Sequence, residues 1–372
     1  MIYLDNAATT KPCPECRTAV ARAMENSFGN ASSLHGLGTD SLQIISRTKR
    51  TLLSALSGTK TPLEGEIIFT SGATESNNTA LLGSAHRFLH RSNKSNKIVT
   101  TAIEHPSVAK NILRFEEDGY EITRLAPKDS ADFVESLVNA VDENTVLLSA
   151  MAVNNETGFA IDIPYLYKEV KRKNPKTIVH VDAVQGFLKV PLDGDLISVS
   201  GHKVHSTKGI GALYIKKGEH ILPLLSGGGQ QHNLRSGTEP IELIAGFEAA
   251  IKAYKGTHEH FSELKNYLLE RLSKMNDIGI NSKEDCLPNI VNFSVRGVRS
   301  EIMLHSLEEG EIYVSNGSAC SKGKKSEVLT AFGVSDKDAD CAVRVSFCAE
   351  NTAAEVDALC NKIEKTIERV RR

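Results

Sequence analysis

Residues 176–186, KTIVHVDAVQG, form a mainly apolar run that stops at Asp182 and continues into small residues. An apolar run without alternation is typical of a parallel strand that is covered on both faces. Similar runs, which we also predict as strands, occupy residues 65–71, 96–103, 144–153, 194–201 and 210–217. Helical patterns lie between several of them, for example over 73–90 and 105–118. This alternation predicts an α/β fold with a mainly parallel sheet between helices.

The pattern changes after about residue 245, where helices and strands no longer alternate regularly. The elements expected there are helices near 241–256, 258–275 and 300–309 and a strand over 289–295. Thr352 and Glu355 form a capping box before a last helix. Its apolar stripe consists of Val356, Leu359, Cys360, Ile363, Ile367 and Val370, so Cys360 is expected in a core. We therefore expect a large domain over 15–245 and a smaller α+β domain over 246–372, to which residues 1–14 return.

Composition excludes several classes of protein. The formal net charge of -2 gives no basis for general nucleic-acid binding, and no apolar run approaches the ~20 residues that span a bilayer. The first residues lack the basic and apolar regions of a secretion signal, so we expect a cytoplasmic protein. The seven cysteines are irregularly spaced, which argues against a disulfide framework. Cys13 and Cys16 form a CxxC without further metal ligands nearby, and we expect free thiols and no metal there.

Polar residues follow the ends of several predicted strands. In TSGATESNN (70–78), Gly72 permits a tight turn before a helix whose free N–H groups, with the hydroxyls of Ser71 and Thr74, could hold an anion. An ordinary helix cap explains the same residues equally well. Asp182 needs a cationic partner if it is buried, either an arginine or a protonated heterocycle.

Other candidates are less specific when taken singly. Lys203 follows a strand in SGHK (200–203) and could be an amine nucleophile, although a solvated lysine is the simpler interpretation. His105 could transfer protons, cap a helix or stack on a planar ligand. Arg344 alternates with apolar residues and should bind a carboxylate of the protein or of a substrate. Cys320 is a thiol in a basic Gly- and Ser-rich stretch, SNGSACSKGKKSEVL (315–329).

Together these features describe a site for pyridoxal phosphate. The phosphate would lie on the helix start, Lys203 would bind the aldehyde, and Asp182 would pair with the ring nitrogen. The sequence also resembles a cysteine desulfurase of the class V aminotransferase family, of fold type I. The motifs that carry this resemblance, in chain order, are YLDNAATT (3–10), FGNASSLH (28–35), TSGATESNN, EHPSV (104–108), NNETG (154–158), HVDAVQ (180–185), SGHK, RSGT (235–238), NGSAC (316–320) and VRVSF (343–347).

The resemblance implies a seven-stranded sheet and a role for each matching residue. Lys203 would form the Schiff base, Asp182 would be the pyridinium partner, and His105 would stack on the ring and help to move protons. The remaining cofactor contacts implied are Ala73, Thr74, Ser200 and His202 at the phosphate, Gln185 and Asn155 near the phenolic oxygen, and Thr238 at the phosphate of the other subunit of a homodimer. Arg344, with Asn30 and Asn155, would bind the substrate.

The implied reaction removes sulfur from L-cysteine, leaving L-alanine and a persulfide on Cys320, with Lys203 shuttling the α-proton. The sulfur would go to an acceptor protein, either an iron–sulfur cluster scaffold or a tRNA-thiolation enzyme. Asn316 and the short basic SKGKKSEVL stretch depart from the family's usual loop, and a solvated surface is the simpler interpretation of Lys322, Lys324 and Lys325. The alternatives are another class V enzyme, such as a selenocysteine lyase or an aminotransferase, and a non-catalytic scaffold.

Overall fold

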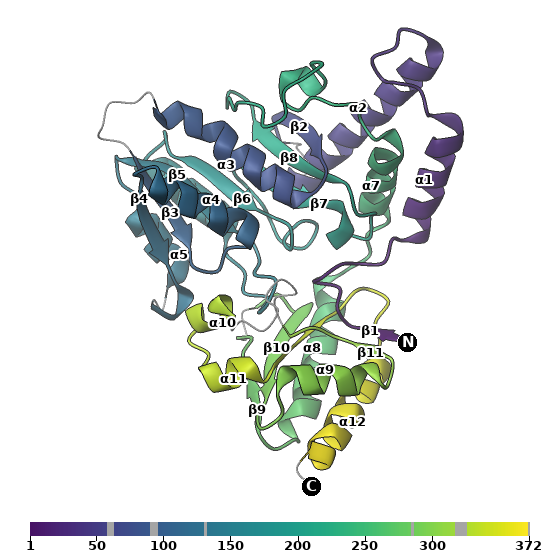
Figure 1. Ribbon diagram of the computed structural model, residues 1–372, viewed down its shortest axis with the longest axis vertical. Coiled ribbons are helices and arrows are strands. Elements are labelled where there is room, and N and C mark those ends of the chain that lie inside the picture. The colour runs from purple at the N-terminus through teal and green to yellow at the C-terminus, as the bar shows by residue number, and fades with distance from the viewer. Residues whose placement is uncertain (58–62, 90–95, 130–131, 284–285, 317–325, 371–372) are drawn as a thin grey trace. The chain divides into compact units, whose positions relative to one another are not determined.

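The computed structural model describes residues 1–57, 63–89, 96–129, 132–283, 286–316 and 326–370 (Figure 1). The chain divides into two compact units. The large unit comprises Lys11–Ala152 and Ile161–Tyr254, and the small unit comprises Met1–Thr10, Val153–Ala160 and Lys255–Arg372. These boundaries differ by up to nine residues from those expected, and 153–160, expected in the large domain, is grouped with the small unit.

Seven strands of the large unit form one sheet, as predicted. Their order across the sheet is β2 (Gly65–Thr70), β8 (Gly211–Lys216), β7 (Leu196–Ser200), β6 (Ile178–Asp182), β5 (Thr145–Met151), β3 (Lys97–Thr101) and β4 (Glu121–Leu125). Only β8 runs against its neighbours, so the prediction of a mainly parallel sheet is confirmed. β4 was not predicted, because this edge strand carries Glu121 and Arg124 on exposed positions and lacks the apolar run of the central strands.

The large unit also contains seven α-helices within its described residues. They are α1 (Pro14–Asn26), α2 (Gly36–Ser57), α3 (Ala73–Leu89), α4 (Pro106–Glu117), α5 (Phe133–Ala140), α6 (Ile163–Lys173) and α7 (Ile241–Ala253). Sequence signals set several starts: Pro106 follows the cap residue His105, and Asp132 and Asp162 cap α5 and α6 with their carboxylates.

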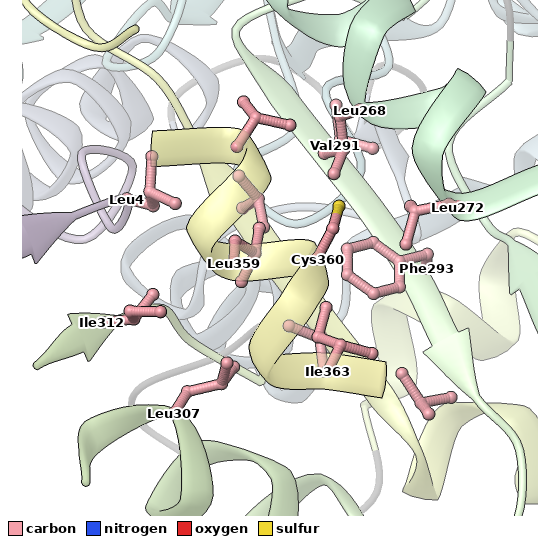
Figure 2. Close-up of a cluster of buried hydrophobic side chains, with 14 of the residues drawn as sticks. Leu4, Leu268, Leu272, Val291, Phe293, Leu307, Ile312, Leu359, Cys360 and Ile363 are labelled. Atoms are coloured by element: carbon pink, nitrogen blue, oxygen red, sulfur yellow. The ribbon is translucent and has the colours of Figure 1, made fainter. Parts of the chain in front are cut away.

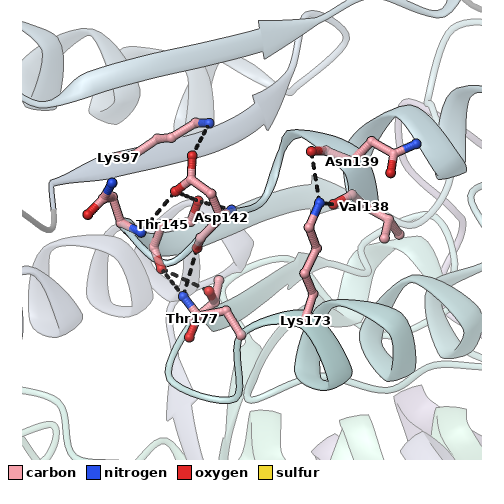
Figure 3. A network of polar contacts seen from close by, with 9 residues as sticks. Lys97, Val138, Asn139, Asp142, Thr145, Lys173 and Thr177 are labelled. Carbon is pink, nitrogen blue, oxygen red and sulfur yellow. Dashed lines mark hydrogen bonds and ion pairs between the residues drawn. The ribbon is translucent and has the colours of Figure 1, made fainter.

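A polar network fixes the amino ends of three parallel strands (Figure 3). Lys97, at the start of β3, donates to the Asp142 carboxylate at 2.8 Å, and the Asp142 amide donates to the Thr145 hydroxyl at 2.9 Å. The Thr177 hydroxyl, just before β6, donates to the Thr145 carbonyl at 2.8 Å. Lys173, at the end of α6, joins this helix to α5 by donating to the Val138 and Asn139 carbonyls. Polar groups at these strand starts are thus satisfied within the protein. The network does not involve the carboxyl ends of the strands.

The small unit has a three-stranded antiparallel sheet and a short parallel pair. The sheet order is β12 (Ala342–Ser346), β10 (Ile290–Val295) and β9 (Ile278–Ile280), and β1 (Ile2–Tyr3) pairs with β11 (Ile312–Tyr313). Its helices are α8 (His258–Ser273), α9 (Ser300–Glu308), α10 (Glu327–Ala331), α11 (Asp336–Asp340) and α12 (Ala353–Val370).

The core of the small unit is apolar and includes Cys360, as expected from the stripe on α12. Cys360 is fully buried and faces Phe293 and Val291 of β10 and Leu268 of α8 (Figure 2). Burial raises the pKa of its thiol to about 11, so this cysteine is a small core side chain and not a thiolate at neutral pH. No helix within the described residues is long and apolar enough to cross a bilayer.

Candidate active site

The carboxyl end of β2 and the carboxyl end of β7 meet across β8. Gly211, the first residue of β8, pairs with Thr70 on one side and with Ser200 on the other. A Cβ at Gly211 would lie 2.8 Å from the Cα of Gly72, so only glycine permits this approach. The first turn of α3, with Ala73 and Thr74, is therefore brought to Ser200. Free N–H groups at a helix start, next to a serine hydroxyl, form a site suited to a phosphate.

Asp182 lies at the carboxyl end of β6 and is only 4% exposed. Its Oδ1 accepts a hydrogen bond from the Val184 amide at 3.1 Å, and its Oδ2 accepts one from Asn77 Nδ2 at 2.8 Å. Both donors are neutral. A buried carboxylate held by neutral donors is well placed to stabilise a protonated ring nitrogen.

His105 caps α4 and stays within electrostatic reach of both Asp182 and Lys203. Its Nδ1 accepts from the Ser107 amide at 3.1 Å and lies 2.8 Å from the Ser107 hydroxyl. Burial lowers the pKa of His105, Asp182 raises it, and the positive charge of Lys203 lowers it. The imidazole is therefore neutral at physiological pH, and a neutral imidazole can accept a proton.

Lys203 ends a short 3-10 helix, Gly201–Lys203, that follows β7 directly. Its neighbour His202 has a pKa lowered to about 4, first by burial and then by the charges of Lys203 and Lys208. A further amine, Lys189, is repelled by Lys203, and its pKa is lowered to about 7, mainly by burial. The Lys189 amine therefore loses its proton more readily than a solvated lysine does, and the unprotonated form of an amine is the form that attacks a carbonyl.

The chemistry of these donors fits pyridoxal phosphate. The large unit supplies a helix start for the phosphate, a lysine for the aldehyde and a buried carboxylate for the ring nitrogen, each on the carboxyl side of the sheet. Ligands of open α/β sheets bind at this side. Gln185 is also buried, three residues beyond Asp182.

Other predicted residues are exposed in the single chain or belong to the small unit. Asn30 and Thr238 are exposed. In the small unit, Arg344 is 2% exposed, contacts the Asp5 carboxylate at 2.7 Å and donates to the Asn155 carbonyl at 2.9 Å. A carboxylate of the protein therefore pairs with Arg344, one of the two partners expected from the sequence. Cys320 lies outside the described residues.

Two residues of the site lie in the predicted motifs but received no role from the sequence. Asn77, one turn into α3, donates to both Asp182 and Ser107. Glu104 is buried, and its Oε1 accepts from the Thr101 hydroxyl at 2.6 Å and the Met151 amide at 2.9 Å. The motifs TSGATESNN and EHPSV indicated that these residues follow the ends of strands. Their roles depend on contacts with distant parts of the chain, which the motifs do not show.

Replacing Glu104 with glutamine should remove a pH dependence of folding. Burial, and less strongly the charge of Asp182, raises the pKa of Glu104 from 4.5 to about 8. A raised pKa contributes stability that is fully present below the unfolded-state pKa and is lost as the pH rises through the folded-state pKa. Between about pH 5 and pH 8 the free energy of unfolding of the wild type should therefore fall by on the order of 4 kcal/mol. Glu104→Gln should not show this decrease.

Urea unfolding over this pH range measures the difference. Glutamine keeps the oxygen that accepts from Thr101 and Met151, so the variant is a matched neutral control. Equal pH dependence in the two proteins would contradict a protonated Glu104.

Comparisons with known proteins find similar sequences and structures over nearly the whole chain. The profile of the family described as aminotransferase class-V matches residues 2–359. A "NifS/IcsS protein homolog" from Lactobacillus delbrueckii subsp. bulgaricus is 38% identical, over 96% of this chain and 94% of that protein. "Cysteine desulfurase IscS" from Dictyoglomus turgidum is 37% identical, over 100% and 95%. A solved structure described as a "NIFS-like protein" matches with a TM-score of 0.87 and 33% identity, over 99% of both chains.

Proposed function

The chain belongs to the class V aminotransferase family and is a pyridoxal-phosphate-dependent cysteine desulfurase, and from this premise we propose how its own residues carry the reaction. The substrate is L-cysteine, the products are L-alanine and a persulfide on Cys320, and the persulfide sulfur then passes to an acceptor. The observation that supports this most strongly is the grouping of Lys203 and Asp182 around His105, because the charges of both act on the imidazole.

Several predicted site residues of the large unit are proposed to hold the cofactor. Lys203 would bind its aldehyde and Asp182 its ring nitrogen. The phosphate would be held by the start of α3 and the end of β7, that is, by Ala73, Thr74, Ser200 and His202, and Gln185 would lie near the phenolic oxygen. When bound, pyridoxal phosphate withdraws electrons from the substrate's α-carbon.

The proton and the sulfur are moved by side chains of this protein. With the cofactor and L-cysteine bound, the Lys203 amine would take the α-proton of the substrate, and neutral His105 is placed to accept a proton nearby. The Cys320 thiolate attacks the substrate sulfur: an S–S bond forms, the substrate's C–S bond breaks, and the carbon keeps the electron pair and is later protonated. The substrate leaves as alanine.

Arg344, with Asn30, is proposed to bind the substrate carboxylate. Asp5 and the Asn155 carbonyl hold two of the terminal nitrogens of the guanidinium, Nη2 and Nη1, so its orientation is set before substrate arrives. A preoriented guanidinium recognises a carboxylate at a smaller entropic cost than a mobile one.

A homodimer is proposed, with Thr238 reaching the phosphate of the other subunit. Thr238 is exposed in the single chain, as this role requires. Large apolar side chains are also exposed along one stretch, from the end of α1 to the first half of α2: Met24, Phe28, Leu34, Leu37 and Leu42. Apolar exposure concentrated in one stretch favours burial against a partner, here a second copy.

The acceptor is proposed to be an iron–sulfur cluster scaffold or a tRNA-thiolation enzyme, and the compartment the cytoplasm. The six described cysteines are all free thiols, which suits a reducing compartment.

Anaerobic addition of L-cysteine to the holoenzyme tests the proposal. We expect one equivalent of alanine and a persulfide that mass spectrometry locates on Cys320, and Cys320→Ala should keep the cofactor's visible absorbance while forming no persulfide. A label on another cysteine, or full activity of Cys320→Ala, would overturn the assignment. Product without any dependence on residue 320 would favour a selenocysteine lyase-type reaction instead.

A further inference from the structure

Glu156, in the NNETG stretch, is a buried acid that the proposed reaction does not use. Its side chain is in the interior of the small unit, at 3% exposure. Burial raises the pKa of its carboxyl, although the Ser326 hydroxyl and the charge of Arg344 oppose this. Burying an acid costs free energy, so its presence calls for a compensating contact.

That contact is with Ser326. The Ser326 hydroxyl donates to Glu156 Oε2 at 2.6 Å, and the hydroxyl oxygen accepts from the Leu329 amide at 3.1 Å. Ser326 thus caps α10 with its oxygen and uses its proton on Glu156. The cap by itself needs only the serine oxygen, so helix capping does not account for the acid.

The position of Ser326 in the chain relates this contact to Cys320. Ser326 follows directly after residues 317–325, which include Cys320. The other end of that segment is held by Ser315, whose carbonyl accepts from the Arg344 amide at 2.6 Å and whose amide donates to the Arg344 carbonyl at 3.2 Å. Both ends are therefore anchored within the small unit.

The stretch that carries Glu156 is itself firmly held. The Glu156 amide donates to Asn154 Oδ1 at 2.9 Å, and the Glu156 carbonyl accepts from Asn292 Nδ2 at 3.2 Å. A second contact joins the same two parts of the chain, because the rings of Phe159 and Phe332 meet edge to face at 5.4 Å.

We propose that Glu156 is a positioning residue for sulfur transfer, which through its hydrogen bond with Ser326 fixes the carboxyl-side anchor of the segment that carries Cys320. The inference rests on the proposed function of Cys320. Loss of the bond leaves the cofactor and the substrate contacts in place but lets the anchor shift, so the thiol reaches the substrate sulfur less often.

Four single variants, Glu156→Ala, Ser326→Ala, Glu156→Gln and Ser335→Ala, test the proposal together with the double variant Glu156→Ala/Ser326→Ala. Glutamine retains an acceptor for Ser326. Ser335→Ala is the matched control, because Ser335 caps the neighbouring helix α11 through the Asp338 amide at 3.1 Å in the same way. The holoenzymes are mixed with L-cysteine, and two signals are followed: the change in the cofactor's visible spectrum, which reports substrate binding, and the persulfide on Cys320 after quenching.

We expect Glu156→Ala and Ser326→Ala each to slow persulfide formation about tenfold, the effect of one lost hydrogen bond to a buried acid. The double variant should be no slower than either single one, since both remove the same bond. The spectral change should keep its dependence on L-cysteine concentration within about twofold, and Glu156→Gln and Ser335→Ala should behave like the wild type. A wild-type persulfide rate in Glu156→Ala, an equal defect in Glu156→Gln, or a parallel loss of both signals would overturn the proposal.

Alkylation of Cys320 by iodoacetamide in the cofactor-free protein separates this inference from the proposed function. The rate should change severalfold in Glu156→Ala and Ser326→Ala but not in Ser335→Ala, and an unchanged rate would contradict the anchor. Absence of a persulfide on wild-type Cys320 would instead contradict the proposed function, while a changed alkylation rate would still support the anchor. Thermal unfolding of each variant identifies any that fails to fold, and if Glu156→Ala fails, Ser326→Ala compared with Ser335→Ala remains as the test of the hydrogen bond.

Discussion

Lys203→Ala is expected to abolish covalent retention of the cofactor and to slow alanine formation by about 10²–10⁴-fold. The variant loses both the amine that binds the aldehyde and the base that takes the α-proton. Because the side chain follows β7 directly, on the 3-10 helix Gly201–Lys203, no other group of that turn can replace it. Borohydride reduction followed by denaturation measures the retention, and steady-state alanine formation measures the rate.

Lys208→Ala is the matched control, since Lys208 is an exposed lysine of the same loop. It should keep the cofactor after reduction and lose little activity. A fixed cofactor band in Lys203→Ala, or its loss in Lys208→Ala, would show that the assignment of the aldehyde-binding lysine is wrong.

Asp182→Asn should slow the reaction by about 10²–10³-fold while the fold is kept, because it removes the negative charge that stabilises a protonated ring nitrogen. Asparagine preserves the size of the side chain and the acceptor for the Val184 amide. The variant amide would face Asn77 Nδ2, and the Asn77 amide must then rotate to offer its Oδ1, which has no hydrogen-bond partner in the wild type. The pH dependence of the cofactor's absorbance and the rate of alanine formation measure the effect.

Asp195→Asn distinguishes loss of charge at the cofactor from loss of a buried carboxylate in general. Asp195 is equally buried, accepts from the Tyr167 hydroxyl at 2.9 Å and pairs with Lys171 at 2.5 Å. Its replacement should lower the free energy of unfolding and leave the cofactor's absorbance unchanged. If Asp182→Asn also altered only stability, its carboxylate would have no part at the ring nitrogen.

The sheet was predictable because a buried strand requires a run of apolar residues, which can be recognised in the sequence. Strands covered on both faces must be apolar along their length, so β5, β6 and β7 are visible as runs of letters, and Asp182 stands out as the charge at the end of one of them. No residue of the edge strand β4 is fully buried, the strand carries Glu121 and Arg124 at exposed positions, and its sequence has no such apolar run. The order of strands, with β8 antiparallel between β2 and β7, also has no local signal.

The sequence by itself determined the α/β class, the family motifs and the residues from which the site is proposed, because each depends on residue type and on spacing within one short stretch. Only the tertiary structure decided which charges meet. Glu104 becomes a proton-bearing acid because burial and Asp182 act on it, and Glu156 becomes an anchor because Ser326, 170 positions later, donates to it. Such contacts join residues that are far apart in the sequence and meet only in the folded protein. The free energy that shifts a pKa or stabilises a hydrogen bond therefore depends on the three-dimensional surroundings and not on the adjacent residues in the sequence.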